Sequence, residues 1–157
     1  MKKIILVTTL LGIGYLSALV PPSTFIDSTT GLEWQDNYED TATGNIKTSS
    51  WSEAIDYCEG LDLANNSDWR LPNINELESI VERSEFNPSI KLGFNVTASD
   101  YYFSSTNFIN GQHGGGATNG GEDANDHKSI WVIDFTNGKV VGDHKSNTHK
   151  VRCVRGN

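Results

Sequence analysis

The stretch NNSDWRLPNINELESI, residues 65–80, decides how the middle of this chain folds. Asn73 followed three residues later by Glu76 is a capping box, in which each side chain accepts a hydrogen bond from a free backbone N–H at a helix start. Pro72 fixes its own φ and keeps the preceding residue extended, so the helix cannot begin earlier. The apolar residues that follow recur at helical spacing. The stretch therefore predicts an extended segment that becomes a short helix after Pro72.

Arg70 lies between Trp69 and Leu71 in this stretch, which places a charge on the way into the interior. A guanidinium that enters a core needs a fixed carboxylate or several carbonyls, because an unpaired buried charge costs several kcal/mol. The candidate partners are the carboxylates of Glu33, Glu76 and Asp134, which the sequence does not rank. This chemistry favours an internal strut over a ligand-binding residue for Arg70.

A second capping box stands upstream, where Ser50 is followed by Glu53. The apolar residues behind it fall on one helical face, and they are Trp51, Ala54, Ile55, Cys58 and Leu61. The pattern predicts a first helix that carries Cys58 on its buried side.

The remaining pattern is typical of short strands. Residues 25–27 and 32–34 flank a turn and read as a hairpin, and residues 101–105 have strand composition. Residues 130–135 place large apolar side chains on both faces, so both faces are expected to be covered. Asn137-Gly138 is a hairpin turn signal before residues 139–141. Residues 151–155 are expected to form the last strand.

The first residues read as a secretory signal over residues 1–18, with a positive start, an apolar run and a small-residue cleavage site. The alternative is a single membrane anchor, but the run is short for one and two prolines follow it. The remaining residues, 19–157, have the size of one domain. We therefore expect one secreted or periplasmic domain without a stable membrane span.

The charge balance and the cysteines agree with export. The chain has 20 acidic and 12 basic residues, a formal net charge of -8, which excludes a uniformly basic nucleic-acid-binding surface. In an oxidising compartment its two cysteines, Cys58 and Cys153, are expected to form one disulfide. The alternative, a metal or catalytic thiol, lacks a CxxC spacing or a nearby histidine.

Six motifs, in order, carry a resemblance: DSTTGLEWQD, WSEAIDYCEGL, DWRLPNINELESI, YYFSST, SIWVIDFTNGKV and VRCVRG. Together they resemble the Lcl C-terminal domain family over nearly the whole mature chain. The resemblance implies an α+β, C-type-lectin-like fold, similar also to formylglycine-generating enzymes, with two helices packed on a twisted antiparallel sheet and long loops. It favours a scaffold role for the tryptophan and arginine motifs. The residues assigned to this structural motif are Trp34, Trp69, Arg70, Leu71, Pro72, Glu76 and Trp131.

Two local features are candidate binding sites. An acidic group in the glycine-rich insertion suits Ca²⁺, with an acidic loop free of metal as the alternative, and it comprises Glu122, Asp123, Asn125 and Asp126. A basic group near the C-terminus suits an acidic glycan, with solvated hairpin charge as the alternative. Its members are Lys139, His144, Lys145, Lys150 and Arg152. The four histidines of the chain are expected to be exposed rather than metal ligands.

A catalytic constellation is not recognisable, because the chain lacks a GxSxG, an HExxH and a phosphate loop. The copper-binding cysteine pair of the generating enzymes has no counterpart either. We therefore expect no enzyme and no obligatory cofactor. The expected function is a binding module, adhesive in one form, that recognises a glycan or protein at the cell envelope through the loop of residues 107–128 and the basic group. The alternative is an assembly domain that mainly makes subunit contacts in a homo-oligomer or surface complex.

Overall fold

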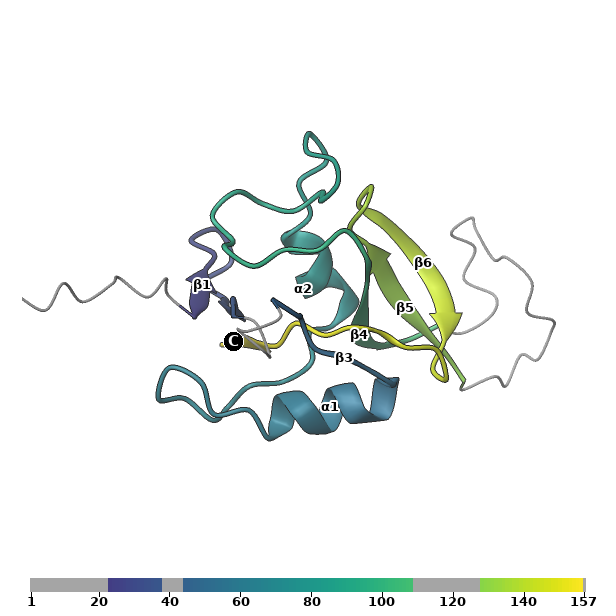
Figure 1. Ribbon diagram of the computed structural model, residues 1–157, viewed down its shortest axis with the longest axis horizontal. Coiled ribbons are helices and arrows are strands. Elements are labelled where there is room, and N and C mark those ends of the chain that lie inside the picture. Colours follow the sequence, from purple (N-terminus) through teal and green to yellow (C-terminus); the bar gives the residue numbers. More distant parts are fainter. Residues whose placement is uncertain (1–22, 38–43, 109–127, 157) are drawn as a thin grey trace, which may run out of the picture.

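The computed structural model describes residues 23–37, 44–108 and 128–156, and its helices and strands form an α+β fold (Figure 1). The helices are α1 (Trp51–Glu59) and α2 (Ile74–Ser79). The strands are β1 (Thr24–Ile26), β2 (Glu33–Gln35), β3 (Thr48–Ser49), β4 (Tyr101–Asn107), β5 (Ser129–Asp134), β6 (Lys139–His144), β7 (His149–Lys150) and β8 (Val154–Arg155). They form two sheets, ordered β1-β2-β8 and β3-β7-β4-β5-β6, in which every pair except β4 with β7 is antiparallel. The architecture is consistent with the lectin-like fold that the motifs imply.

Both helices begin where the capping boxes predict. At α1 the carboxylate of Glu53 accepts hydrogen bonds from the N–H and the hydroxyl of Ser50, at 3.0 and 2.8 Å. At α2 the N–H of Glu76 donates to Asn73 Oδ1, and the Asn73 N–H donates back to Glu76 Oε2, at 2.9 and 2.8 Å. Helix α1 ends at Glu59, two residues before Leu61, the last residue of its apolar stripe.

The core consists of two apolar clusters on opposite faces of the five-stranded sheet. Val132 faces the α1 cluster, while the next residue, Ile133, faces the α2 cluster with Leu77. Successive strand residues point to opposite faces, so this alternation buries β5 on both sides as predicted. The C-terminal chain contributes to both clusters, with Val151 on the α1 side and Val154 on the α2 side.

The prediction of one strand over residues 151–155 is wrong. The chain leaves the five-stranded sheet after β7 and enters the three-stranded sheet at β8, as the yellow C-terminal trace in Figure 1 shows. Between the two strands, the Val151 N–H donates to Lys47 O and the Cys153 carbonyl accepts from Gln35 N, both at 2.9 Å. The backbone changes partners here because it crosses from one sheet to the other.

The predicted disulfide is confirmed. Cys58 on α1 and Cys153 are bonded, with a Cα–Cα distance of 5.5 Å and a sequence separation of 95 residues. Both side chains are fully buried in the α1 cluster. The bond therefore ties the end of the chain to its first helix. Within residues 23–37, 44–108 and 128–156, no helix is both long enough and apolar enough to cross a membrane.

The turn between β5 and β6 supports a first prediction about stability. Gly138 has φ +73°, and a Cβ added there would lie 2.6 Å from Val81 Cγ1. Gly31 has nearly the same φ, +74°, but an added Cβ would meet nothing within 4 Å. Gly138→Ala should therefore lower the free energy of unfolding by about 2 to 3 kcal/mol, and Gly31→Ala by about 1 kcal/mol. Urea unfolding of the two variants measures the difference, and equal losses would show that the contact with Val81 relaxes without cost.

Candidate functional site

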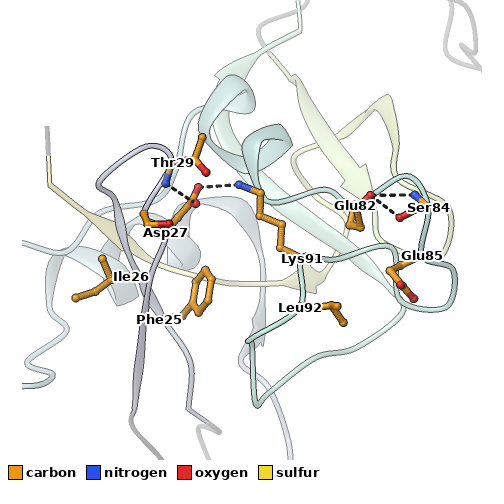
Figure 2. Close-up of a pocket in the computed structure, with 10 residues that line it drawn as sticks. Phe25, Ile26, Asp27, Thr29, Glu82, Ser84, Glu85, Lys91 and Leu92 are labelled. Carbon is orange, nitrogen blue, oxygen red and sulfur yellow. Dashed lines mark hydrogen bonds and ion pairs between the residues drawn. The ribbon is translucent and has the colours of Figure 1, made fainter.

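An open cleft of about 490 Å³ lies between the turn that follows β1 and the loop that follows α2 (Figure 2). We call it the loop cleft. The hairpin side contributes Phe25, Ile26 and Asp27, and the loop side contributes Glu82, Ser84, Glu85, Lys91 and Leu92. The volume falls within the range of small ligand sites, which is about 300 to 1,000 Å³.

Asp27 organises the hairpin side of the loop cleft. Its carboxylate accepts hydrogen bonds from the Thr29 N–H at 3.1 Å and from the Thr30 hydroxyl at 2.9 Å, which closes the turn locally. Figure 2 shows Lys91 reaching across the cleft to the same carboxylate, at 3.0 Å. Burial raises the pKa of Asp27, but the hydrogen bonds from Lys91, Thr29 and Thr30 outweigh it and hold this pKa below its ordinary value. Asp27 is therefore ionised at neutral pH, and its ion pair joins the two walls.

Backbone hydrogen bonds fix the loop side. The Ser89 N–H donates to Phe135 O at 2.7 Å, the Asn87 N–H donates to Thr136 O at 3.1 Å, and the Lys91 N–H donates to Ile80 O at 2.9 Å. The loop is thus attached to the end of β5 and to the end of α2. Loops held on a rigid scaffold in this way commonly carry binding residues.

Three large apolar side chains are exposed in the loop cleft and in a second hollow that shares Leu92 with it. Ile26 is 65% exposed, Phe86 71% and Leu92 82%. Leu92 also lines the second hollow of about 360 Å³, together with Phe86. Grouped apolar exposure of this kind marks interaction surfaces in proteins. The loop cleft is therefore the candidate functional site.

The structural motif occupies the scaffold. Trp34, Trp69, Leu71 and Pro72 are buried, and half-buried Trp131 packs edge to face on Phe108 with ring centroids 4.6 Å apart. None of these residues lines the loop cleft.

Arg70 pairs with Glu76 but does not enter the core. Its two terminal nitrogens each donate to a Glu76 oxygen at 2.7 Å, and its side chain is 39% exposed. Glu76 also caps α2, so the ion pair braces the capping box. Burial raises the pKa of Glu76, but the hydrogen bonds from Arg70 and Asn73 lower it by more. The pKa therefore lies below its ordinary value, and the carboxylate is ionised at neutral pH. The expectation of an arginine directed into the interior is wrong for Arg70, whereas Glu76 is confirmed as its partner among the three candidates.

The arginine inside the protein is Arg152, which the sequence analysis assigned to the basic ligand-binding group. Its side chain is 3% exposed, and the guanidinium lies 4.5 Å from the centre of the Phe94 ring. It donates to Gln35 O at 2.7 Å and to Val96 O, and it lies 3.7 Å from the fully buried carboxylate of Asp36. Because the guanidinium is buried and donates to backbone carbonyls beside a buried carboxylate, Arg152 is a structural residue, and its assignment to a ligand surface is corrected.

The structure also separates the other members of the basic group. Lys139 and His144 are the first and last residues of β6 and so lie at opposite ends of it. Lys145 Nζ lies 4.1 Å from the centre of the Trp51 ring, and Lys150 Nζ donates to the Thr48 hydroxyl at 2.9 Å. Lys139 is therefore separated from His144 by the length of β6, whereas Lys145 and Lys150 both contact side chains of the segment 48–51.

The histidines differ from one another in burial. His144 is exposed as expected, and its Nδ1 lies 2.7 Å from the Ser146 hydroxyl. His149 departs from the expectation of exposure, because its side chain is 10% exposed and Nε2 lies 2.6 Å from Asp143 Oδ2. His149 therefore belongs to the packed part of the hairpin, and an acidic residue lies within the group predicted to be basic.

The predicted calcium ligands lie outside the described residues, and so do His113 and His127. The predicted calcium ligands are Glu122, Asp123, Asn125 and Asp126, which belong to the loop for which we predicted ligand contacts. Among the residues that the structure does describe, no three His, Cys, Asp or Glu side chains are grouped as a metal site. The calcium hypothesis stays a prediction.

No sequence motif indicates the loop cleft. Its walls come from residues 25–29 and 82–92, which are distant in the chain and carry no common motif. One signal was present: Phe86 and Leu92 are large apolar residues in a stretch with neither helical nor strand periodicity. No periodic pattern assigns these two residues to the core, and both are exposed in the structure.

Comparison with known proteins gives one result. A search of curated proteins finds no match. The model of the Lcl C-terminal domain matches residues 23–155, which includes both sheets, both helices and the disulfide. The match agrees with the order of the six sequence motifs, and the chain belongs to the Lcl C-terminal domain family.

Proposed function

We propose that this chain is a non-catalytic binding module that works outside the cytoplasm and holds a protein partner at the cell envelope through the loop cleft. The observation that carries the proposal is the group of exposed apolar side chains at Ile26, Phe86 and Leu92. Buried apolar anchors supply most of the binding energy in protein interfaces. A protein surface can cover such side chains, and this favours a protein over a glycan as the partner.

Two further features support the compartment and the lack of catalysis. A buried disulfide persists in an oxidising environment such as the periplasm or the exterior, which suits the predicted secretory signal. The polar groups of the loop cleft also serve local structure: Asp27 closes the hairpin turn, and Glu82 accepts both hydrogen bonds that Ser84 donates, at 3.1 and 2.7 Å. We therefore assign these residues to shape and charge, not to chemistry on a substrate.

The proposal predicts saturable binding of the purified mature chain to envelope fragments of the producing cell. Leu92→Ser and Phe86→Ser should each weaken this binding about tenfold or more, since each removes an anchor that the partner would bury. Tyr101→Ser is the matched control, because Tyr101 is 39% exposed on β4 and lines neither the loop cleft nor the second hollow that Phe86 and Leu92 share. All variants should keep the melting temperature of the parent chain within a few degrees, since the cleft side chains contribute little to the core.

Treatment of the fragments separates the possible partners. Protease treatment should abolish binding, whereas periodate oxidation of glycans should leave it intact. Loss of binding after periodate alone would replace the protein partner with a glycan. No saturable binding, together with a stable oligomeric mass that Leu92→Ser reduces, would instead identify an assembly domain.

A further inference from the structure

The charges around the loop cleft are unbalanced. Asp27, Glu82, Glu85 and Lys91 are its charged lining residues, so three carboxylates face one ammonium group. Lys91 is paired with Asp27 at 3.0 Å, in an ion pair whose side chains are 26% and 4% exposed. The ammonium group of Lys91 is thus paired with the hairpin wall, and the carboxylates of Glu82 and Glu85 on the loop wall have no ion-pair partner among the described residues.

The nearest basic side chain on the loop does not correct this imbalance. Arg83 stands between the acidic positions in sequence, but its guanidinium pairs with Glu78 at 2.6 Å. Glu85 has no hydrogen bond or ion pair from its carboxylate to any residue that the structure describes, and its side chain is exposed. The hydrogen bonds from the Ser84 hydroxyl and N–H lower the pKa of Glu82, so this carboxylate is charged at neutral pH. The loop wall therefore presents two negative charges next to Leu92.

The apolar surface lies within reach of these charges. Leu92 follows Lys91 directly and is 82% exposed, while Ile26 on the opposite wall is 65% exposed. Lysine and arginine side chains combine an apolar stem with a cationic end, so they match a surface of this composition. Strand β1 adds an edge: among the described strands it has a neighbour on one side only, and an extended segment can pair with such an edge.

We propose that the loop cleft binds an extended protein segment that carries both basic and apolar side chains on each of its faces. The inference rests on the proposed function and names the chemistry of its partner. The basic side chains meet Glu82 and Glu85, and the apolar side chains cover Leu92 and Ile26. A second copy of this chain fits less well, because the formal net charge of -8 makes two copies repel one another where the cleft needs a cation.

The test uses short, end-blocked fluorescent peptides and the full mature chain. The probe repeats Leu-Leu-Lys-Lys, so that each face of the extended peptide carries both residue types. One control peptide replaces each lysine with glutamate, and another replaces each leucine with serine. Fluorescence anisotropy should show saturable binding of the leucine–lysine peptide, at least about tenfold weaker binding of both controls, and weaker binding as salt is raised.

Matched variants locate the binding. Glu82→Gln/Glu85→Gln keeps the hydrogen-bond acceptors but removes both charges, and it should weaken peptide binding about tenfold. Glu59→Gln/Asp62→Asn removes two charges from exposed positions on and just after α1, outside the loop cleft, and should leave binding within about twofold. Equal effects of the two double variants would overturn the assignment to the cleft.

The outcomes also distinguish a failure of this inference from a failure of the proposed binding function. If no peptide binds but envelope binding is saturable and sensitive to Leu92→Ser, the basic–apolar segment is wrong and the binding module stands. If the glutamate peptide binds as well as the lysine peptide, the charge argument fails. If neither peptides nor envelope fragments bind, both proposals fail together.

Discussion

Loss of the disulfide is expected to lower the free energy of unfolding by about 4 to 5 kcal/mol, the largest effect we predict for this chain. The reason is the length of the closed loop: Cys58 and Cys153 are 95 residues apart, and cross-linking residues that far apart strongly restricts the unfolded chain. The measurement is urea unfolding of Cys58→Ser/Cys153→Ser beside the oxidised parent chain.

A second sample provides the control. The parent chain unfolded under strong reducing conditions should show the same midpoint as the double variant, because both lack only the cross-link. Both cysteines are fully buried in the native state, so reduction should proceed through unfolding and be slow without denaturant. A midpoint for the double variant within error of the oxidised parent would show that the native contacts alone hold the C-terminal segment to α1.

Arg152→Ala is expected to lower the free energy of unfolding by about 3 to 5 kcal/mol, because it removes one partner of a buried charge pair. The Asp36 carboxylate would keep hydrogen bonds from the N–H groups of Asn95 and Val96, both at 2.8 Å, but it would lose its only nearby cation among the described residues. The carbonyls of Gln35 and Val96 would lose donors as well. This group connects the end of β2, the loop before β4 and the C-terminal segment.

Arg70→Ala is the matched control for this prediction. Arg70 also pairs with a carboxylate, but its side chain is 39% exposed and solvent screens the ion pair. Arg70→Ala should therefore lower the free energy of unfolding by only about 1 kcal/mol. Arg152→Lys retains the charge but loses the paired N–H donors. Its loss of unfolding free energy should therefore lie between those of Arg70→Ala and Arg152→Ala. Chemical denaturation at neutral pH gives the three values. Equal losses for Arg70→Ala and Arg152→Ala would contradict the buried role of Arg152.

The features that the sequence predicted are those that depend on neighbours in the chain or on composition. The capping boxes at Ser50 and Asn73 are confirmed because a cap involves residues three positions apart. The Asn137-Gly138 turn is confirmed for the same reason, with β5 and β6 paired through six residue pairs. The disulfide was predicted from two cysteines in a chain with an expected secretory signal, which needs no knowledge of the fold.

The two arginines show where such prediction ends. In VRCVR, alternation places Arg152 opposite Val151 and Cys153, on the side expected to be exposed. That side is covered by Phe94 and Val96, from a loop about 55 residues away in sequence, which no local pattern indicates. Arg70, in contrast, stands among buried neighbours, yet Glu76 holds it at the surface.

The loop cleft was missed for a similar reason. Its walls meet through the Asp27–Lys91 ion pair and the contact of the Phe25 and Phe94 rings, whose centroids are 4.2 Å apart. Both contacts join residues more than sixty positions apart. The acidic residues of the loop wall are indistinguishable in sequence from ordinary surface charge. Only their position beside exposed Leu92 makes them candidates for recognition.

The most direct test of the loop cleft as the binding surface is site-specific photo-crosslinking in the producing cell. A benzophenone amino acid would replace Leu92 in one strain, Glu59 on α1 in a second and Lys145 near the C-terminal hairpin in a third. Each position is surface-accessible, and only Leu92 lines the cleft. We predict a discrete, protease-sensitive adduct of the chain from position 92 and none of comparable yield from positions 59 and 145. An adduct from position 145 with none from position 92 would contradict the account and return the binding surface to the basic hairpin.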